Sequence, residues 1–225
     1  MAEVDSVLRG NSWGSRVFYS AIRFIVVVFC RTWLKLSVIG SENIPSQGAF
    51  ILAPIHRSIM DIPIASGVTR RRMRFMGKDS LWHFKPLGAM FSALGAFPVT
   101  RGSADLEALK RCIYVITAGD PLVLFPEGTR QSGDTLQPLF DGAAYVAVKT
   151  QVPIVPVGIG GSEEIMPSGS RRIRRRKCVA VVGAPIYPSK IDGNRAARSE
   201  VRELTAKLAV ELQTLFDEAL KAARR

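Results

Sequence analysis

Residues 50 to 61 read Phe-Ile-Leu-Ala-Pro-Ile-His-Arg-Ser-Ile-Met-Asp, and this stretch decides the fold. Its apolar, β-prone start predicts a strand that stops at Pro54, with His56 and Asp61 directly beyond it. Five residues of regular helix turn by about 140°, so these two side chains would face apart on an unbroken helix. They meet if His56 lies in a turn and Asp61 begins the next helix. Pro63 is tolerated there because the first helical N–H groups lack partners.

A histidine beside a carboxylate is a candidate for general-base chemistry. If Asp61 accepts the Nδ1–H of His56, the tautomer is fixed and Nε2 is left to take a proton from a hydroxyl. The same spacing also arises by chance, so the pair by itself leaves both interpretations open.

Composition narrows the class of protein. With 225 residues and 47% hydrophobic content, the chain can bury one sizeable core. The cysteines Cys30, Cys112 and Cys178 are far apart and form no C-x-x-C pair. This predicts a reduced, cytosol-facing protein without a disulfide framework or a zinc site. A net charge of +12 indicates an anionic partner: nucleic acid, an acidic membrane surface or a phosphorylated substrate.

Short apolar runs alternate with segments of helical length along most of the chain. The expected strands are 50–53, 73–76, 96–99, 121–125, 153–159 and 178–183, and the expected helices lie around 80–93, 103–118 and 140–150. A closing amphipathic helix carries Val201, Leu204, Leu208, Leu212 and Leu215 at helical spacing. This alternation predicts a single α/β domain over residues 40–225, with a largely parallel sheet flanked by helices. Ligands bind such sheets beyond the carboxyl ends of the strands.

The N-terminal segment, residues 1–39, is expected to form a helix at a membrane interface. Its apolar and aromatic part is interrupted by Arg16, Arg23, Arg31 and Lys35. The uncharged run from Phe24 to Cys30 is shorter than the roughly 20 residues of a spanning helix, and no small-residue cleavage site follows, so neither a span nor a signal peptide is expected. Trp13 and Trp33 suit an interfacial helix, and a core helix with exposed arginines is the alternative.

A second informative stretch, residues 121–130, reads Pro-Leu-Val-Leu-Phe-Pro-Glu-Gly-Thr-Arg. An apolar strand ends there, and polar residues follow at its carboxyl end. Gly128 permits a tight turn, and Arg130 offers a fork of donors suited to a phosphate. Glu127 either holds Arg130 or binds an acceptor hydroxyl. An ordinary turn with a surface ion pair is the alternative.

Two more cations follow expected strands in the same way. Lys78 comes after the strand at 73–76, and Arg101 follows the strand at 96–99. In a parallel sheet these ends lie side by side, so Lys78, Arg101 and Arg130 are expected to converge near His56 as a phosphate pocket. Singly, each would be a solvated charge.

Four ordered blocks carry a resemblance to a known family. They are His56-x-x-x-x-Asp61, Gly95-x-Phe97-x-x-x-Arg101, Phe125-Pro-Glu-Gly-Thr-Arg130 and Val152-Pro-Ile-Val-Pro-Val157. Over residues 40 to 187 the chain resembles the glycerolipid acyltransferases typified by 1-acylglycerol-3-phosphate acyltransferase. It departs from the family at Ile55, where Asn usually precedes the histidine, and at residues 98–100, and these departures leave the acceptor open.

The resemblance implies a role for each matching residue. His56 would be the general base and Asp61 its orienting carboxylate. The glycerol phosphate of the acceptor would be bound by Arg101, Glu127, Gly128, Thr129 and Arg130, and Lys78 joins them on the physical argument alone. The block from Val152 to Val157 would line the acyl site, with its prolines at a strand end or edge.

The implied reaction moves an acyl group from acyl-CoA or acyl carrier protein to a glycerol-phosphate hydroxyl, without a metal, a cofactor or a covalent enzyme intermediate. The expected acceptor is 1-acylglycerol 3-phosphate, giving phosphatidate; glycerol 3-phosphate, a lysophospholipid or a glycolipid are alternatives. Backbone N–H groups after His56 are the expected oxyanion donors.

The expected location is the cytoplasmic face of the cell membrane, as a peripheral or monotopic protein. The basic segments 70–74 and 171–177 would contact anionic lipid or coenzyme A phosphates, or be solvated loops. A nucleic-acid-binding protein is the remote alternative, because the sequence has no helix-turn-helix, zinc-finger or RNA-binding signature. A serine hydrolase is not expected either, since no G-x-S-x-G elbow occurs.

Overall fold

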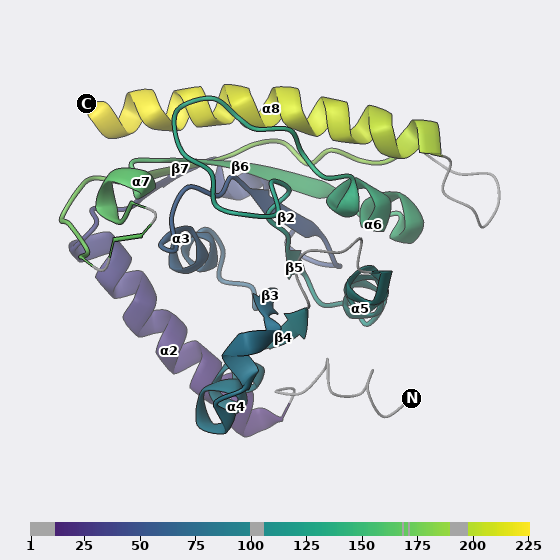
Figure 1. Cartoon of the computed structure of the whole chain (residues 1–225), viewed down its shortest axis with the longest axis horizontal. Helices are drawn as coiled ribbons and strands as arrows, with labels where there is room; N and C mark the ends of the chain where they lie inside the picture. Colours follow the sequence, from purple (N-terminus) through teal and green to yellow (C-terminus); the bar gives the residue numbers. More distant parts are fainter. Residues whose placement is uncertain (1–11, 100–105, 168, 171, 190–197) are drawn as a thin grey trace.

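A seven-stranded sheet in the order β1-β7-β6-β2-β5-β3-β4 forms the centre of the molecule (Figure 1). The computed structural model describes residues 12–99, 106–167, 169–170, 172–189 and 198–225. The strands are β1 (Ser37–Ile39), β2 (Ile51–Pro54), β3 (Arg74–Lys78), β4 (Ala96–Val99), β5 (Leu122–Val123), β6 (Ile154–Gly160) and β7 (Val179–Val182). The helices are α2 (Trp13–Thr32), α3 (Asp61–Gly67), α4 (Lys85–Ala93), α5 (Leu106–Thr117), α6 (Gly142–Thr150), α7 (Ser162–Ile165) and α8 (Arg198–Arg224), with 3-10 turns η1 (Ser41–Asn43) and η2 (Asp79–Trp82).

Five of these strands run in the same direction. β2 lies between β6 and β5, and β3 lies between β5 and β4, and all four pairings are parallel. β7 is antiparallel to β6, and β1 is parallel to β7. Every residue of β2, β5 and β6 is buried, as is usual for parallel strands covered on both faces. The carboxyl ends of β6, β2, β5, β3 and β4 therefore lie along one edge of the sheet.

Helices cover both faces of the sheet. Figure 1 shows α2 and α3 on one side and α5, α6 and α8 on the other. The long helix α8 packs directly on the β6 backbone. A Cβ atom at Gly158 would lie 2.3 Å from the carbonyl of Leu215, and one at Gly160 would lie 2.3 Å from the carbonyl of Ala219. The missing side chains of these two glycines therefore allow the close approach.

Helix α2 leaves most of its apolar side chains exposed. Only Tyr19 and Cys30 are buried, whereas Trp13 is 82% exposed and Phe24 is 69% exposed. Its Arg23 donates hydrogen bonds to the carbonyls of Ser66 and Thr69, which hold α2 against the end of α3. The helix has 20 residues and a mean hydropathy of 1.4. By length and composition alone it could cross a membrane, which its short uncharged run did not suggest.

The structure confirms the predicted α/β class, the largely parallel sheet and the apolar N-terminal helix. Two elements were not predicted: the short strand β1, which joins the sheet from within residues 1–39, and the one-turn helix α7. The helix expected over 80–93 is divided into η2 and α4, and the strand expected over 121–125 is reduced to two residues.

Pro156 lies inside β6, so the expected position at a strand end or edge is wrong for this proline. It is opposite Ala53 of β2, and its carbonyl accepts the N–H of Gly183 at 2.9 Å on the β7 side. β7 ends at Val182, and pairing resumes only at the bridge between Ile154 and Ile186. The ladder is thus already interrupted where the proline N–H is missing.

Candidate active site

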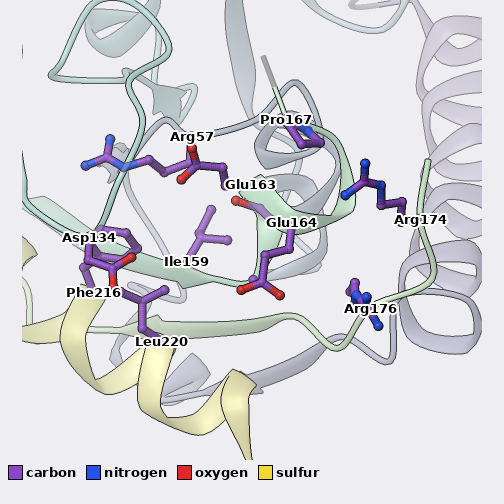
Figure 2. Close-up of a pocket in the computed structure, with 12 residues that line it drawn as sticks. Arg57, Asp134, Ile159, Glu163, Glu164, Pro167, Arg174, Arg176, Phe216 and Leu220 are labelled. Atoms are coloured by element: carbon purple, nitrogen blue, oxygen red, sulfur yellow. The ribbon is translucent and has the colours of Figure 1, made fainter. Parts of the chain in front are cut away.

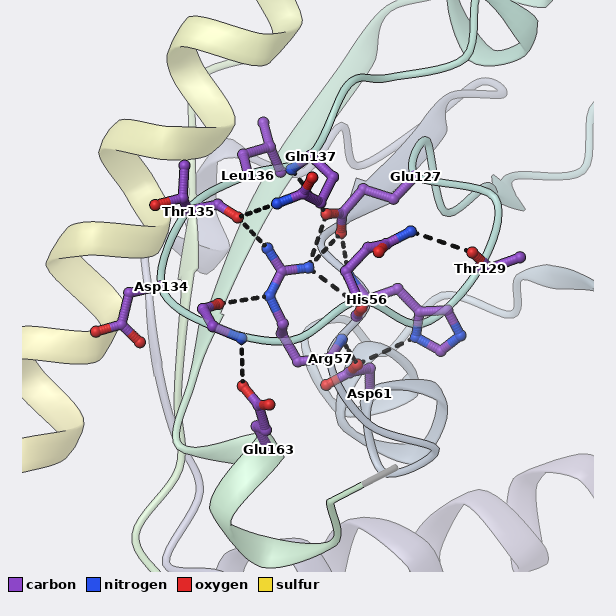
Figure 3. A network of polar contacts seen from close by, with 12 residues as sticks. His56, Arg57, Asp61, Glu127, Thr129, Asp134, Thr135, Leu136, Gln137 and Glu163 are labelled. Atoms are coloured by element: carbon purple, nitrogen blue, oxygen red, sulfur yellow. Dashed lines mark hydrogen bonds and ion pairs between the residues drawn. The ribbon is translucent and has the colours of Figure 1, made fainter. Parts of the chain in front are cut away.

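His56 and Asp61 meet at the carboxyl end of β2, as their spacing predicted. Nδ1 of His56 lies 3.1 Å from Oδ2 of Asp61 (Figure 3). The histidine occupies the turn after β2, and Asp61 is the first residue of α3, with Pro63 inside its first turn. Both residues are buried, with His56 5% and Asp61 0% exposed. The strand–turn–helix arrangement therefore brings the two side chains together.

Asp61 is held in place by the backbone of the same turn. Its Oδ2 also accepts the N–H groups of Arg57 and Ser58, each at 2.6 Å. These interactions fix the carboxylate relative to the imidazole. They also occupy the N–H groups of Arg57 and Ser58, the first two after His56, so these two are not the expected oxyanion donors.

The ring of His56 is fixed from a second direction. It stacks on Phe125, which follows β5, with the ring centroids 4.1 Å apart and the planes inclined by 27°. Within the described part of the chain, no protein atom forms a hydrogen bond with Nε2. The ring therefore keeps a defined orientation while its outer nitrogen can accept a proton.

A buried ion pair beneath the histidine was not predicted. Nη1 of Arg57 lies 2.7 Å from Oε1 and 2.8 Å from Oε2 of Glu127. The guanidinium also donates to the carbonyls of Gly133 at 2.9 Å and Thr135 at 3.1 Å. Its carbon lies 5.0 Å from the ring centroid of Phe216 on α8. The Arg57 guanidinium thus has a carboxylate partner and two further carbonyl acceptors.

Glu127 therefore has a different partner from the one expected. Its Oε2 accepts the backbone N–H of His56 at 2.9 Å, and its side chain is 0% exposed. The carboxylate is committed to Arg57 and to the His56 turn, not to Arg130. The signal in the sequence was the position of Glu127 after a fully apolar strand, where a carboxylate needs a buried cation.

The next three residues, Gly128, Thr129 and Arg130, are exposed beside this turn. Gly128 has a φ of 69°, and a Cβ there would lie 2.8 Å from the ring of Phe140, so both backbone and space favour glycine. The N–H of Gln131 binds the carbonyl of His56 at 2.8 Å. This contact keeps the segment that carries Arg130 against the histidine.

Of the other two predicted cations, Lys78 lies within the described residues. Lys78 is the exposed last residue of β3, opposite Val99 of β4. The strand order places its end next to that of β5 and two strands from β2. Arg101 lies outside the described residues, so the convergence of Lys78, Arg101 and Arg130 as a phosphate pocket stays a prediction.

Arg57 also lines a cavity of about 370 Å³ (Figure 2). Its polar lining comes from Arg57, Asp134, Glu163, Glu164, Arg174 and Arg176, and its apolar lining includes Ile159, Phe216 and Leu220. His56 and Asp61 do not line it. Arg57 thus belongs to both places, because its backbone N–H binds Asp61 and the same residue lines the cavity. Among the described residues, no group of three or more His, Cys, Asp or Glu side chains is placed to hold a metal ion.

A buried His–Asp pair beyond a central parallel strand is an arrangement that is chemically able to accept a proton from a hydroxyl. Residues 35–160, more than half of the sequence, match the family model named Acyltransferase, and the chain belongs to this family.

Relatives and a solved structure support the assignment to the acyltransferase family. The chain is 33% identical over 162 residues to the chloroplast 1-acyl-sn-glycerol-3-phosphate acyltransferase BAT2 of Brassica napus, covering 70% of this chain and 47% of the relative. It is 29% identical over 168 residues to the 1-acyl-sn-glycerol-3-phosphate acyltransferase of Bacillus subtilis, covering 71% and 81%. The crystal structure of the 1-acyl-sn-glycerophosphate acyltransferase PlsC of Thermotoga maritima matches with a TM-score of 0.71 and 26% identity over 88% of this chain and 80% of that chain. The chain spans about half the length of two relatives, 47% of the Brassica napus protein and 49% of the chloroplast 1-acyl-sn-glycerol-3-phosphate acyltransferase LPAT1 of Arabidopsis thaliana.

Proposed function

We propose that this protein transfers a fatty acyl group from an acyl thioester to the free hydroxyl of 1-acylglycerol 3-phosphate, giving phosphatidate. The donor is acyl-CoA or acyl-acyl carrier protein. The observation that carries the proposal is the His56–Asp61 pair, 3.1 Å apart, beyond β2 of an acyltransferase-family fold. The printed names of the Brassica, Bacillus and Thermotoga proteins support the choice of acceptor.

The proposed chemistry needs one proton carrier. Asp61 holds the Nδ1–H of His56, so Nε2 takes the proton of the acceptor hydroxyl as its oxygen attacks the thioester carbonyl. The tetrahedral intermediate then collapses, the carbon–sulfur bond breaks, and the imidazolium returns its proton to the leaving thiolate. His56 ends in its starting state, and no covalent enzyme intermediate forms.

The acceptor phosphate is proposed to bind Arg130, with Gly128, Thr129, Lys78 and Arg101 around it. Arg130 is exposed and lies one residue before Gln131, which binds the His56 carbonyl. A guanidinium near the attacking hydroxyl suits a phosphomonoester. We do not propose that Glu127 touches the acceptor, because both of its carboxylate oxygens bind Arg57. It acts on the site by positioning Arg57 and His56.

The proposed location is the membrane surface, on the cytoplasmic side. Trp13, Phe24 and Ile25 of α2 are 82%, 69% and 62% exposed, and such an apolar face fits the interfacial layer of a bilayer. Arg172, Arg174, Arg175 and Arg176 are also exposed, and they would add an attraction to anionic lipid or to the phosphates of coenzyme A. A membrane-borne acceptor would then reach His56 without leaving the surface.

The test measures the release of free thiol from one long-chain acyl-CoA with four acceptors in turn: 1-acylglycerol 3-phosphate, glycerol 3-phosphate, a zwitterionic lysophospholipid and a glycolipid. We expect the highest kcat/KM with 1-acylglycerol 3-phosphate. His56→Ala should lower the rate by about 10²- to 10⁴-fold, the usual contribution of a general base.

His83→Ala is the matched control, because His83 is exposed in the turn after η2. This variant should keep the parent's rate. Unchanged turnover in His56→Ala would remove the mechanism, and equal turnover of all four acceptors would remove the assignment of the substrate.

A further inference from the structure

A second hollow, a groove of about 1070 Å³, lies away from the catalytic pair. It is formed by one side of α2, by β1 with the loop that follows it, and by residues 67–71. Ser46 and Arg71, which line it, precede β2 and β3 in the chain, whereas His56 follows β2. The groove therefore reaches the amino ends of the same parallel strands whose carboxyl ends carry the proposed active site.

The charged lining of the groove is entirely positive. Arg23, Arg31, Arg70 and Arg71 line it, and none of the other described lining residues is acidic. Arg71 donates to the carbonyls of Pro45 at 2.8 Å and Gly48 at 2.6 Å, and Arg23 binds carbonyls as well. Neutral acceptors do not cancel a positive charge. In the described part of the chain, no carboxylate forms an ion pair with any of these four arginines.

The cations are close enough to affect one another. Burial lowers the pKa of Arg23, and the charges of Arg31 and Arg70 lower this pKa further, against an opposing effect of Tyr19. Arg31 and Arg70 are themselves exposed. An anion placed between them would relieve the repulsion from these charges, and it would meet two guanidinium groups that bind no carboxylate of the described residues.

The uncharged part of the lining includes Ser37, Ser41, Ser46 and Thr69, but most of it is apolar. Phe24, Val27, Val28, Leu36, Ile44 and Val68 line the groove. Phe24 and Val28 are 69% and 42% exposed, so this wall continues into the open apolar face of α2. A ligand that satisfies both parts must carry an anionic head and an apolar chain. The volume is at the upper end of the roughly 300–1,000 Å³ of small-molecule pockets.

We propose that this groove binds one anionic phospholipid, with its phosphate between Arg31 and Arg70 and an acyl chain along Phe24 and Val28. The lipid would be a structural ligand and not a substrate, because the groove and His56 lie at opposite ends of β2. It would hold α2 against residues 67–71. The inference concerns binding alone, so it stands apart from acyl transfer.

The test uses the full chain and soluble lipids below their micelle concentration, so that binding is not partition into a bilayer. Dihexanoyl phosphatidylglycerol, dihexanoyl phosphatidylcholine and inorganic phosphate are each titrated by calorimetry. We expect saturable binding of the phosphatidylglycerol, with at least tenfold weaker binding of the other two. Arg31→Ala/Arg70→Ala should weaken phosphatidylglycerol binding at least tenfold. Val28→Ser should weaken it while leaving the weak phosphate binding as it is.

Arg198→Ala/Arg202→Ala, which removes two exposed arginines from α8, is the matched control and should bind like the parent. Equal binding of phosphate, equal binding of phosphatidylcholine, or full binding by Arg31→Ala/Arg70→Ala would each overturn the proposal. Loss of binding in Arg130→Ala instead would place the lipid in the proposed acceptor site. A change of oligomeric state in Arg31→Ala/Arg70→Ala, with unchanged lipid binding, would make the groove an interface between copies.

Thiol release separates this proposal from the proposed function. With water-soluble short-chain substrates, Arg31→Ala/Arg70→Ala should keep the parent's activity. A variant that loses lipid binding but keeps activity supports the groove as a separate site. An inactive parent that still binds phosphatidylglycerol would overturn the acyltransferase proposal and leave this one standing.

Discussion

The active-site turn beyond β2 and the groove at the amino ends of the strands differ in how far their charged side chains are buried. Beyond β2 and β5, the side chains of His56 and Asp61 are 6% and 0% exposed, and those of Arg57 and Glu127 are 1% and 0% exposed. At the amino ends, Arg31 and Arg70 are exposed and have no carboxylate partner in the described part of the chain. A buried charge must be paired with good geometry, whereas an exposed one costs little when left open. The four buried residues therefore have fixed geometry, whereas the two exposed arginines are open to a ligand.

The largest expected effect comes from the buried end. Asp61→Asn should lower kcat by about 10²- to 10⁴-fold with little change in KM, because an amide no longer fixes the Nδ1–H tautomer of His56. Initial rates of thiol release measure it. Asp217→Asn, an exposed change on α8, is the control. A kcat within twofold of the parent's would show that the carboxylate is not needed to orient the ring.

The next effect is on stability. Glu127→Gln leaves the guanidinium of Arg57 buried without its counter-ion, so the free energy of unfolding should fall by about 3–5 kcal/mol. Urea unfolding measures this loss. The control is Glu107→Gln, whose pair with Lys110 is 65% and 70% exposed and whose unfolding should match the parent's. If both variants unfold alike, the buried pair does not differ from a surface one.

A smaller effect is expected at the exposed edge of the active site. Arg130→Ala should raise KM for 1-acylglycerol 3-phosphate by about 10- to 100-fold, the equivalent of one charge-assisted hydrogen bond of about 1.5–3 kcal/mol. Stability should be unaffected. The comparison is with an uncharged monoacylglycerol acceptor. An equal rise in both KM values would contradict the assignment of Arg130 to the phosphate.

The smallest effects test the amino end with two neighbouring residues. Arg70→Ala should change the free energy of unfolding by no more than about 0.5 kcal/mol, because Arg70 is exposed. Arg71→Ala removes bonds to the carbonyls of Pro45 and Gly48 and should cost about 1 kcal/mol. Urea unfolding of both variants measures these two changes in the free energy of unfolding. A loss at Arg70 as large as at Arg71 would show that Arg70 is already paired and unsuited to a ligand.

Local signals were enough to predict the His56–Asp61 pair. An apolar strand, a proline, a turn and a helix start lie within twelve residues, so spacing alone limited the geometry. Arg57 and Glu127 are 70 positions apart, and no local pattern connects them. Their pairing depends on β2 and β5 being neighbours in the sheet. The alternation of strands and helices predicts the α/β class, but it does not predict the order of the strands.

The sequence also did not predict the shortest strand or which face of the N-terminal helix is exposed. β1 has only three residues with the pattern exposed, half-buried, exposed, and it is a strand because β7 lies beside it. In α2, the sequence showed arginines among apolar residues. It could not show that Arg23 turns toward α3 while Phe24 and Ile25 face outward, because that choice depends on the carbonyls of Ser66 and Thr69.

Helix α8 completes the packing around Arg57, and it is synthesised after every strand of the sheet. Arg57 lies over Phe216, and the N–H of Leu136 binds Oε1 of Gln213 at 2.7 Å. The ribosome makes both of these α8 residues after every strand of the sheet. A nascent chain that has already formed β2 and β5 still lacks the ring above Arg57 and the amide that holds the loop beside it. The packing around Arg57, the residue next to His56, is therefore complete only after α8 has been synthesised and has docked.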